Sequence, residues 1–400
     1  METHSFFLQL LVILLTARFL GEIATRIQIP AVLGELLAGI LLGPSLLGWL
    51  QPTEVFQLLA EIGIILLVFQ VGLETDMRRL IRAGPRAAIV AFTGFVLPFL
   101  LGFGFSYYLF DFPLLIALFI GGTLTATSIG ITIRVLTDLH CHNTPEAQIV
   151  LGAAVIDDIF GIVLLALLYE FSIGGGVSFA NASKALLFIG IFFLMAPIAA
   201  RAMSMVIKRF DNASEIPGLI PTTVVSLVLF FAWLAHMVGA PELLGGFAAG
   251  LALSRRFFLP FGIALQNDPG FSRQIEKQMR PIAQLFTPIF FVVVGLSLDL
   301  TAVDWSQLMT WVLSLFLLLA AVIGKLSAAV AIDCTLRERF AIGLAMLPRG
   351  EVGLIFAELG RESGILNQEV YAALIIVIAL TTLAAPLLLK AHYQCARAST

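Results

Sequence analysis

Two adjacent acids, Asp157 and Asp158, lie in the middle of an otherwise apolar stretch at residues 150–163. If this stretch is a membrane helix, each charged carboxylate at its centre costs roughly 2.5–3.5 kcal/mol, and nothing nearby in the sequence offsets that cost. Neighbouring side chains on a helix point about 100° apart, so the two acids can take different partners. A buried structural ion pair is the simpler interpretation, but two such acids together indicate a site that holds a cation or protons.

A single lysine, Lys325, interrupts a second apolar stretch at residues 320–329. We expect it deep inside a spanning helix, too far from either end to reach the lipid headgroups. Buried lysine gives up its proton readily, whereas a nearby carboxylate favours the charged form. Lys325 is therefore expected either to form a permanent salt bridge or to pair with an acid in one state and release its proton in another.

Two further segments contain residues that suit helices badly. Residues 121–130 are rich in Gly and Thr, and residues 347–353 contain Pro and two Gly. Together they predict two broken helices, whose exposed ends carry partial charges that can face an ion. The alternative is ordinary kinked packing, eased by small residues. Three hydroxyls in the first segment are candidate additional ligands for a small cation: Thr125, Thr127 and Ser128.

Arg349 and Glu351 flank Gly350 in the second broken segment. Residues two apart do not face each other on a regular helix, so we expect them to pair with other neighbours or to brace freed backbone groups. Both are predicted to be structural charges at the broken helix. Four other polar residues are expected to be structural or span-end groups: Glu35, Glu74, Glu358 and His236.

The composition places these residues in a membrane protein. Of 400 residues, 60% are hydrophobic and 12% are charged, whereas soluble domains carry about 25% charged residues. Lipid offers backbone groups no hydrogen bonds, and runs of about 20 apolar residues favour helices over barrel strands. The three cysteines have no zinc or redox spacing. We expect an all-α integral membrane protein with no cofactor and no nucleic-acid partner.

Hydropathy predicts thirteen spans. They cover residues 5–24, 31–49, 56–75, 85–108, 113–136, 145–169, 182–207, 219–238, 241–255, 273–298, 305–331, 337–360 and 367–390. Most Lys and Arg flank alternate loops, while the opposite loops hold only Lys184 and Arg361. The positive-inside rule then places the N-terminus outside and the C-terminus in the cytoplasm. We expect a multi-pass protein of the cell inner (plasma) membrane.

An internal repeat in opposite orientation is also indicated. Residues 35–43 match residues 242–250, and residues 71–76 match residues 294–299. These matches align spans seven apart, and an odd offset means that the two copies point in opposite directions. Inverted repeats of this kind build many secondary transporters. The predicted repeat units cover about 1–169 and 219–390, joined by a linker helix at about 182–207, in one membrane domain over 1–400.

Four segments resemble the monovalent cation:proton antiporter-2 family, and its NapA-type sodium/proton antiporters in particular. They are residues 125–132, residues 152–158 with the tandem Asp, Gly324-Lys325, and residues 348–355. The tandem Asp with the downstream Lys is a specific signature, whereas the Gly-rich segments alone are weak. The similarity extends over nearly the whole chain, and we expect no C-terminal nucleotide-binding domain of the kind found in the Kef-type branch.

The resemblance implies the NapA/NhaA-like antiporter fold, with two crossing broken helices, and a homodimer. A core domain, from about 56–169 and 273–360, would slide in the manner of an elevator against a dimerisation domain formed by the remaining helices. It also implies that Asp158 binds the cation and that Asp157 pairs with Lys325. Because Asp rather than Asn comes first in the pair, the family expectation is electrogenic exchange.

The sequence thus predicts a secondary active antiporter, not an enzyme, that exchanges cytoplasmic Na+ or Li+ for external H+. Protons and sodium would compete for Asp158, and this competition would couple their fluxes. A K+/H+ antiporter of the same fold is the nearest alternative, since selectivity depends on the dimensions of the cavity. A cation channel fits the broken helices, but fits the buried charges less well. An intramembrane aspartyl protease needs two Asp from separate helices, and these are adjacent.

Overall fold

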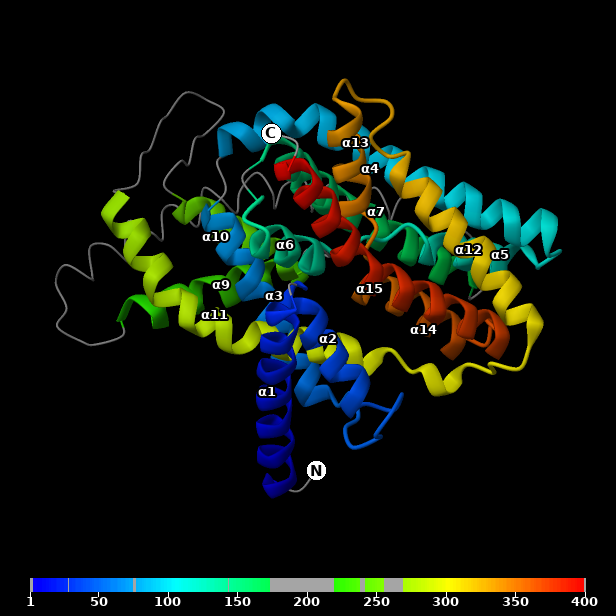
Figure 1. Cartoon of the computed structure of the whole chain (residues 1–400), viewed down its shortest axis with the longest axis horizontal. Coiled ribbons are helices and arrows are strands. Elements are labelled where there is room, and N and C mark those ends of the chain that lie inside the picture. The colour runs from blue at the N-terminus through cyan, green and yellow to red at the C-terminus, as the bar shows by residue number, and fades with distance from the viewer. Residues whose placement is uncertain are drawn as a thin grey trace. The chain divides into compact units, whose positions relative to one another are not determined.

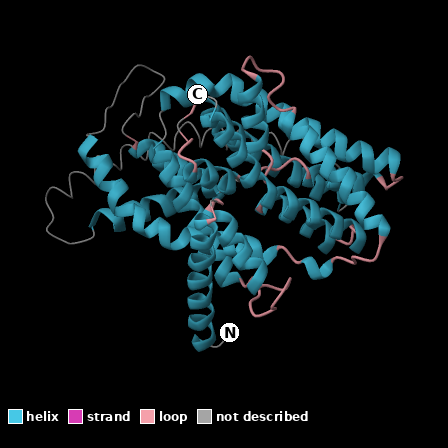
Figure 2. Ribbon diagram, viewed as in Figure 1, coloured by secondary structure: helices cyan, strands magenta, loops and turns pink. Residues whose placement is uncertain are grey.

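The computed structural model describes residues 3–27, 29–74, 77–142, 144–172, 219–237, 242–254 and 269–398. Within these ranges the chain forms helices joined by loops, with no strand (Figure 2). Eight of the described helices are long and apolar enough to cross a membrane. The predicted all-α membrane class is therefore confirmed. The predicted span at 182–207 lies outside the described residues.

Contacts divide the chain into two compact units. The first contains residues 1–54, 83–178 and 291–400, and the second contains residues 55–82 and 179–290. The first unit holds α1 (Thr3–Arg26), α2 (Ala31–Leu42), most of α4 (Met77–Gly104), α5 (Leu114–Thr123), α6 (Ile129–Asp138), α7 (Pro145–Ser172), α12 (Leu308–Leu326), α13 (Leu336–Ala345), α14 (Glu351–Glu362) and α15 (Gln368–Ala398). The second unit holds α3 (Glu54–Glu74), α9 (Leu219–Met237), α10 (Glu242–Leu253) and most of α11 (Pro269–Ser297).

The apolar centre of the first unit joins α5, α12, α14 and α15, which Figure 1 shows running close together at one end of that unit. Phe119 of α5 and Phe356 of α14 are fully buried there. Gly122 of α5 leaves room for the Phe356 ring, because a Cβ at this glycine would lie 2.8 Å from the ring. Close contact of this kind, rather than exclusion from water, holds helices together in lipid.

In the first unit, α2 packs tightly against α1 and against the last turns of α11. A Cβ on Gly34 would lie 2.6 Å from the backbone nitrogen of Gly21, and a Cβ on Gly39 would lie 2.7 Å from the Cα of Gly295. Real Cβ atoms do not approach other atoms so closely, so both positions require glycine. The backbone of α2 therefore lies directly on the backbones of its two neighbours.

The second unit repeats this arrangement with α9, α10 and α3. A Cβ on Gly245 would lie 2.6 Å from the backbone nitrogen of Ala232, and a Cβ on Gly250 would lie 3.0 Å from the Cα of Gly72. Gly245 and Gly250 thus take the places of Gly34 and Gly39, and Gly72 takes that of Gly295.

These contacts correct one of the two internal matches. The match of residues 71–76 with 294–299 aligns Gly72 with Gly295, in agreement with the structure. The match of residues 35–43 with 242–250 aligns Gly39 with Gly246, whereas the contacts equate Gly39 with Gly250. The error is four residues, about one helical turn. Because glycines recur at four-residue spacing in both helices, a shift by one turn still superimposes glycine on glycine.

The fifth and twelfth predicted spans are each two short helices. α5 ends at Thr123 and α6 begins at Ile129, while α13 ends at Ala345 and α14 begins at Glu351. Gly and Pro, together with Thr and Ser hydroxyls that bond the backbone, favour the extended segments between them.

The eleventh span is shorter than expected, and this changes the position of Lys325. The prediction placed Lys325 deep within a span at 305–331, but α12 ends at Leu326 and Lys325 lies in its last turn. Just past the helix, the hydroxyl of Thr93 in α4 donates to the carbonyl of Ala328 at 2.5 Å. A continued helix would have offered that carbonyl to an amide of the next turn. Lys325 nevertheless stays fully buried.

Candidate functional site

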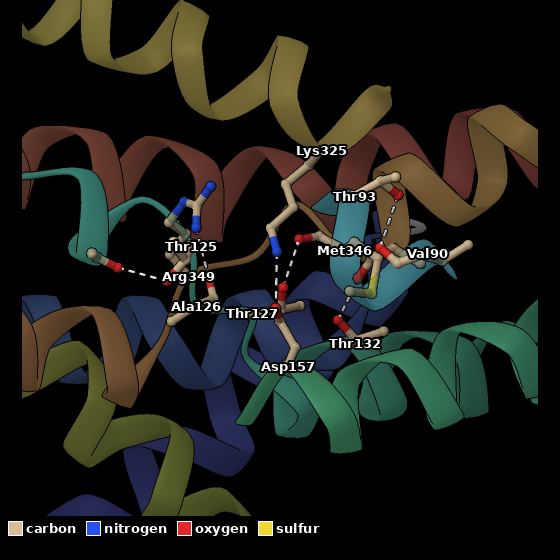
Figure 3. A network of polar contacts seen from close by, with 12 residues as sticks. Val90, Thr93, Thr125, Ala126, Thr127, Thr132, Asp157, Lys325, Met346 and Arg349 are labelled. Atoms are coloured by element: carbon tan, nitrogen blue, oxygen red, sulfur yellow. Dashed lines mark hydrogen bonds and ion pairs between the residues drawn. The ribbon is translucent and has the colours of Figure 1, made fainter. Parts of the chain in front are cut away.

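Asp157 of α7 and Lys325 of α12 form a buried ion pair. Lys325 Nζ lies 3.0 Å from Asp157 Oδ2, and both side chains are 0% exposed (Figure 3). Taking two charges out of water is costly, and only good geometry and further polar contacts repay that cost. Lys325 also lies at the C-terminal end of α12, where the partial negative charge of the helix favours a cation.

Asp158, the next residue of α7, is also buried, with 5% of its surface exposed. A small residue on the same helix, Gly161, keeps α7 slim, and a Cβ there would lie 3.6 Å from Val352 of α14. This face of α7 therefore runs close to the beginning of α14. The structure brings both acids and Lys325 into the interior, next to the helices that are interrupted.

The two interrupted segments cross each other and are joined by backbone and side-chain hydrogen bonds. The N–H of Ser128 donates to the carbonyl of Pro348 at 2.8 Å, and the hydroxyl of Thr127 donates to the carbonyl of Met346 at 3.2 Å. Gly350 permits this close crossing, because a Cβ there would lie 2.5 Å from the hydroxyl oxygen of Ser128. Figure 3 shows Thr127 beside Asp157, so the crossing lies next to the ion pair.

The candidate ligand hydroxyls occupy the first extended segment. Thr125 donates to the carbonyl of Gly122 at 2.7 Å, at the C-terminal end of α5. Thr125, Thr127 and Ser128 are all at most 1% exposed. A hydroxyl that donates its hydrogen to a carbonyl keeps its lone pairs, so the Thr125 and Thr127 oxygens can still accept a cation. The beginnings of α6 and α14 and the ends of α5 and α13 add helix-end charges around the crossing.

Arg349 is fully buried in the second extended segment. Its Nη1 donates to the carbonyl of Ala126 at 2.7 Å, and its own backbone carbonyl accepts a hydrogen bond from the hydroxyl of Thr382 in α15. Its other nitrogens, Nε and Nη2, have no hydrogen-bond acceptor among the residues that the structure describes. The guanidinium thus ties the second segment to the first, and adds a positive charge near Asp157. Glu351 begins α14, but its side chain lies outside the described part.

Sequence reasoning did not identify several polar residues around this region. Thr382 holds a backbone carbonyl at the second interruption, and Thr93 holds one just after α12. A hydroxyl inside an apolar helix is too common a feature to single them out. Glu35, expected to be a structural or span-end group, is buried and paired with Arg134, a partner that the sequence does not indicate. His236 does have a simple partner, since its Nδ1 lies 2.6 Å from Glu242 Oε1 at an exposed position.

The arrangement can hold a small cation or protons in place of bulk water. It supplies two carboxylates, an amine, a guanidinium and several hydroxyl and carbonyl oxygens, all inside a helical membrane protein. No described group brings together three His, Cys, Asp or Glu residues in the manner of a resident metal site.

Comparison with known proteins decides the family. The profile described as "Sodium/hydrogen exchanger, transmembrane" matches residues 11–392. The chain belongs to the sodium/hydrogen exchanger family. It is therefore a membrane transporter and not an enzyme, as the composition and the buried charges predicted.

Two relatives and one solved structure of this exchanger family illustrate the similarity. The chain is 32% identical to the high-affinity Na(+)/H(+) antiporter NhaS3 of Synechocystis, over 98% of this chain and 90% of that protein. It is also 32% identical to the Na(+)/H(+)-K(+) antiporter GerN of Bacillus cereus, over 96% and 95%. The sodium proton antiporter MjNhaP1 from Methanocaldococcus jannaschii matches in structure with a TM-score of 0.69 and 17% identity, over 98% and 97% of the two chains. This last likeness supports the antiporter fold.

Proposed function

We propose that this exchanger moves Na+ or Li+ out of the cytoplasm in exchange for external H+, as a NapA-type member of the monovalent cation:proton antiporter-2 family. The observation that carries the proposal is the buried Asp157–Lys325 ion pair, with Asp158 beside it and the crossing of two interrupted helices next to them. The names of the relatives, which include Na(+)/H(+) antiporters, support the choice of ions.

Asp158 is the proposed binding group for the cation. Bare sodium loses its hydration shell on entering the protein, so the site has to supply negative charge and oxygen ligands. Asp158 supplies the charge, and Thr125, Thr127 and Ser128 supply oxygens from the neighbouring segment. A proton and a sodium ion cannot both fully occupy one carboxylate, so binding of one releases the other. This competition couples the two fluxes in opposite directions.

Lys325 is the proposed carrier of a second proton. In one state its ammonium pairs with Asp157, as the 3.0 Å contact between them suggests. When Asp157 releases it, the desolvated amine gives up a proton, because burial disfavours the charged form. One sodium ion would then leave for two protons that enter, and each cycle would move net charge. Arg349 and Glu351 are proposed to hold the broken segment in shape rather than to bind ions.

Access from alternate sides of the membrane requires part of the protein to move. We propose thirteen spans in two inverted repeats, with the N-terminus outside and the C-terminus in the cytoplasm of a plasma-membrane homodimer. The interrupted helices and α7 would move as a core against a dimerisation domain. Three assignments differ from the sequence-based division, which gave α3 and α11 to the core and the last span to the dimerisation domain. Because the backbones of α3 and α11 lie directly on those of α10 and α2, we place α3 and α11 in the dimerisation domain. Because α15 packs against α12, α13 and α14, we place it in the core.

A K+/H+ antiporter of the same fold is the second candidate. It is favoured by one observation, the similarity to GerN, whose name includes both sodium and potassium. The same carboxylate and hydroxyl oxygens can bind either ion, and cavity size selects between them.

Purified protein in vesicles tests the proposal directly. An outward sodium gradient should drive proton uptake, with sodium, lithium and potassium compared in parallel. Asp158→Asn should abolish the exchange, while Glu22→Gln, which removes an exposed carboxylate paired with Arg26, should leave it intact. Normal exchange by Asp158→Asn would contradict the assignment of this residue. Cation flux that needs no counter-ion would indicate a channel, and exchange that is independent of membrane voltage would exclude the electrogenic form.

A further inference from the structure

A second group of charges connects α2 with α6, with Glu35 buried and Arg134 and Asp138 partly buried. Glu35 of α2 has a side chain only 2% exposed, and its Oε1 lies 3.4 Å from Arg134 Nη2. Arg134 is on α6, and its Nε lies 3.2 Å from Oδ1 of Asp138, one turn further along the same helix. One guanidinium is therefore shared between two carboxylates, of which only Asp138 is fixed to the same helix.

The two helices joined by this group belong to different packing arrangements. α2 is locked to α1 and to the end of α11 through Gly34 and Gly39, where the backbones touch. α6 is locked to the other interrupted helix, because the hydroxyl of Thr132 donates to the carbonyl of Ala345 at 2.6 Å. The pair of Glu35 and Arg134 thus bridges the helices packed around α2 and the helices of the crossing.

We propose that Glu35 and Arg134 form a releasable latch between α2 and α6, and that Asp138 holds Arg134 while the latch is open. This inference rests on the proposed function, in which the crossing moves relative to the other helices. Motion of α6 away from α2 would separate Arg134 from Glu35. Arg134 would keep a partner because Asp138 travels on its own helix.

The charges explain why a shared guanidinium suits this task. An uncompensated buried charge is strongly unfavourable, so an arginine with Glu35 as sole partner would resist separation. With Asp138 present, Arg134 keeps a carboxylate partner, and opening breaks the contact of Glu35 with Arg134 and the hydrogen bond from the Ala31 backbone at the start of α2 to Asp138. Both contacts of Arg134 are longer than the 2.7–2.9 Å usual for charge-assisted hydrogen bonds, and Glu35 Oε2 has no partner among the described residues. The latch is thus weak enough to release.

Distance measurements between two spin labels test the latch without relying on transport. One label replaces Leu37, which is exposed on α2, and the other replaces His140, which is exposed just after α6. The three native cysteines are changed to alanine. Pulsed electron–electron double resonance then gives the populations of short and long distances between the two labels in the full-length protein.

Glu35→Gln removes the releasable contact and should raise the ratio of long to short distances by about fivefold or more. Asp138→Asn should have the opposite effect, because Arg134 is then held by Glu35 alone, and should lower that ratio by a similar factor. Glu22→Gln, which neutralises an exposed acid on α1, should leave the distances unchanged. Asp138→Glu keeps the charge and should resemble the parent.

Opposite shifts are the decisive result, since general loosening of the structure would move both variants in the same direction. If Asp138→Asn does not fold, the distance distribution of Glu35→Gln alone decides whether the latch exists. The proposal is overturned if Glu35→Gln does not shift the distances, if both variants shift them the same way, or if no second distance appears. Exchange assayed on the same samples separates the two hypotheses. If the protein exchanges ions but Glu35→Gln does not shift the distances, the latch is contradicted. If the distances shift but the protein does not exchange ions, the proposed function is contradicted.

Discussion

Neutralising one partner of the Asp157–Lys325 pair should destabilise the protein more than neutralising both. Nζ and Oδ2 are 3.0 Å apart and neither side chain is exposed, so Asp157→Asn or Lys325→Gln alone leaves a charge with neither its partner nor water. Breaking a buried pair in this way costs about 3–5 kcal/mol. The double variant leaves two neutral polar groups that can still bond to each other. We expect a coupling free energy of about 2 kcal/mol between the two positions.

Thermal unfolding in detergent at neutral pH, without transported cations, measures this coupling. Membrane proteins of this size commonly unfold irreversibly, so the order of apparent melting temperatures is the readout, at one fixed heating rate. Both single variants should melt well below the parent, with the double variant above each of them. The exposed pair of Glu22 and Arg26, 2.9 Å apart, is the matched control. Its removal should change stability by about 1 kcal/mol or less.

Additive losses would refute the reasoning. If the double variant melts at a temperature given by the sum of the two single effects, the charges do not depend on each other. The pair would then not be the closed, water-free contact on which the proposed proton release relies.

Three further predictions concern the crossing and the bound ions. Gly350→Ala should lower the rate of exchange at least tenfold, because the new Cβ would lie 2.5 Å from the hydroxyl of Ser128 and force the interrupted helices apart; vesicle flux measures this. Thr382→Val should lower the unfolding free energy by about 1 kcal/mol and weaken cation affinity, because the carbonyl of Arg349 at the break loses its hydrogen bond. Thr381→Val is the control and should not change cation affinity, because the hydroxyl of Thr381 bonds within its own helix. Acidic pH should slow exchange, and higher sodium should restore it, because protons and sodium compete for Asp158; a rise in the half-saturating sodium concentration as pH falls would be the sign of this competition.

Much of the site could be predicted from residue types alone. Asp157, Asp158 and Lys325 stand out because charge inside an apolar run is costly, and the cost is visible without coordinates. The interruptions near Thr125 and Arg349 could be predicted as well, because Gly, Pro and hydroxyl side chains disfavour continuous helices. These signals are local in the sequence, so a single chain suffices to find them.

Other features depend on contacts between distant residues. The partner of Glu35 could not be predicted, since Arg134 carries the signature of an ordinary loop-flanking charge. The chain just after α12 contacts Thr93, more than 200 residues away in the sequence, whose hydroxyl donates to the carbonyl of Ala328. The four-residue error in aligning Gly39 arose because one helical turn restores the same face, so only the packing partners distinguish the two registers.

The close backbone contacts at glycines constrain how this protein can change shape. Where α2 lies on the end of α11, and where α10 lies on α3, backbone meets backbone with no side chain between them. Two such helices cannot slide along each other, because the backbone of one fits only at the glycine of the other. At a neighbouring position it would collide with a side chain. Each of these helix pairs must therefore move as one rigid body. Any rearrangement that opens a path for ions has to bend the chain outside these glycine contacts.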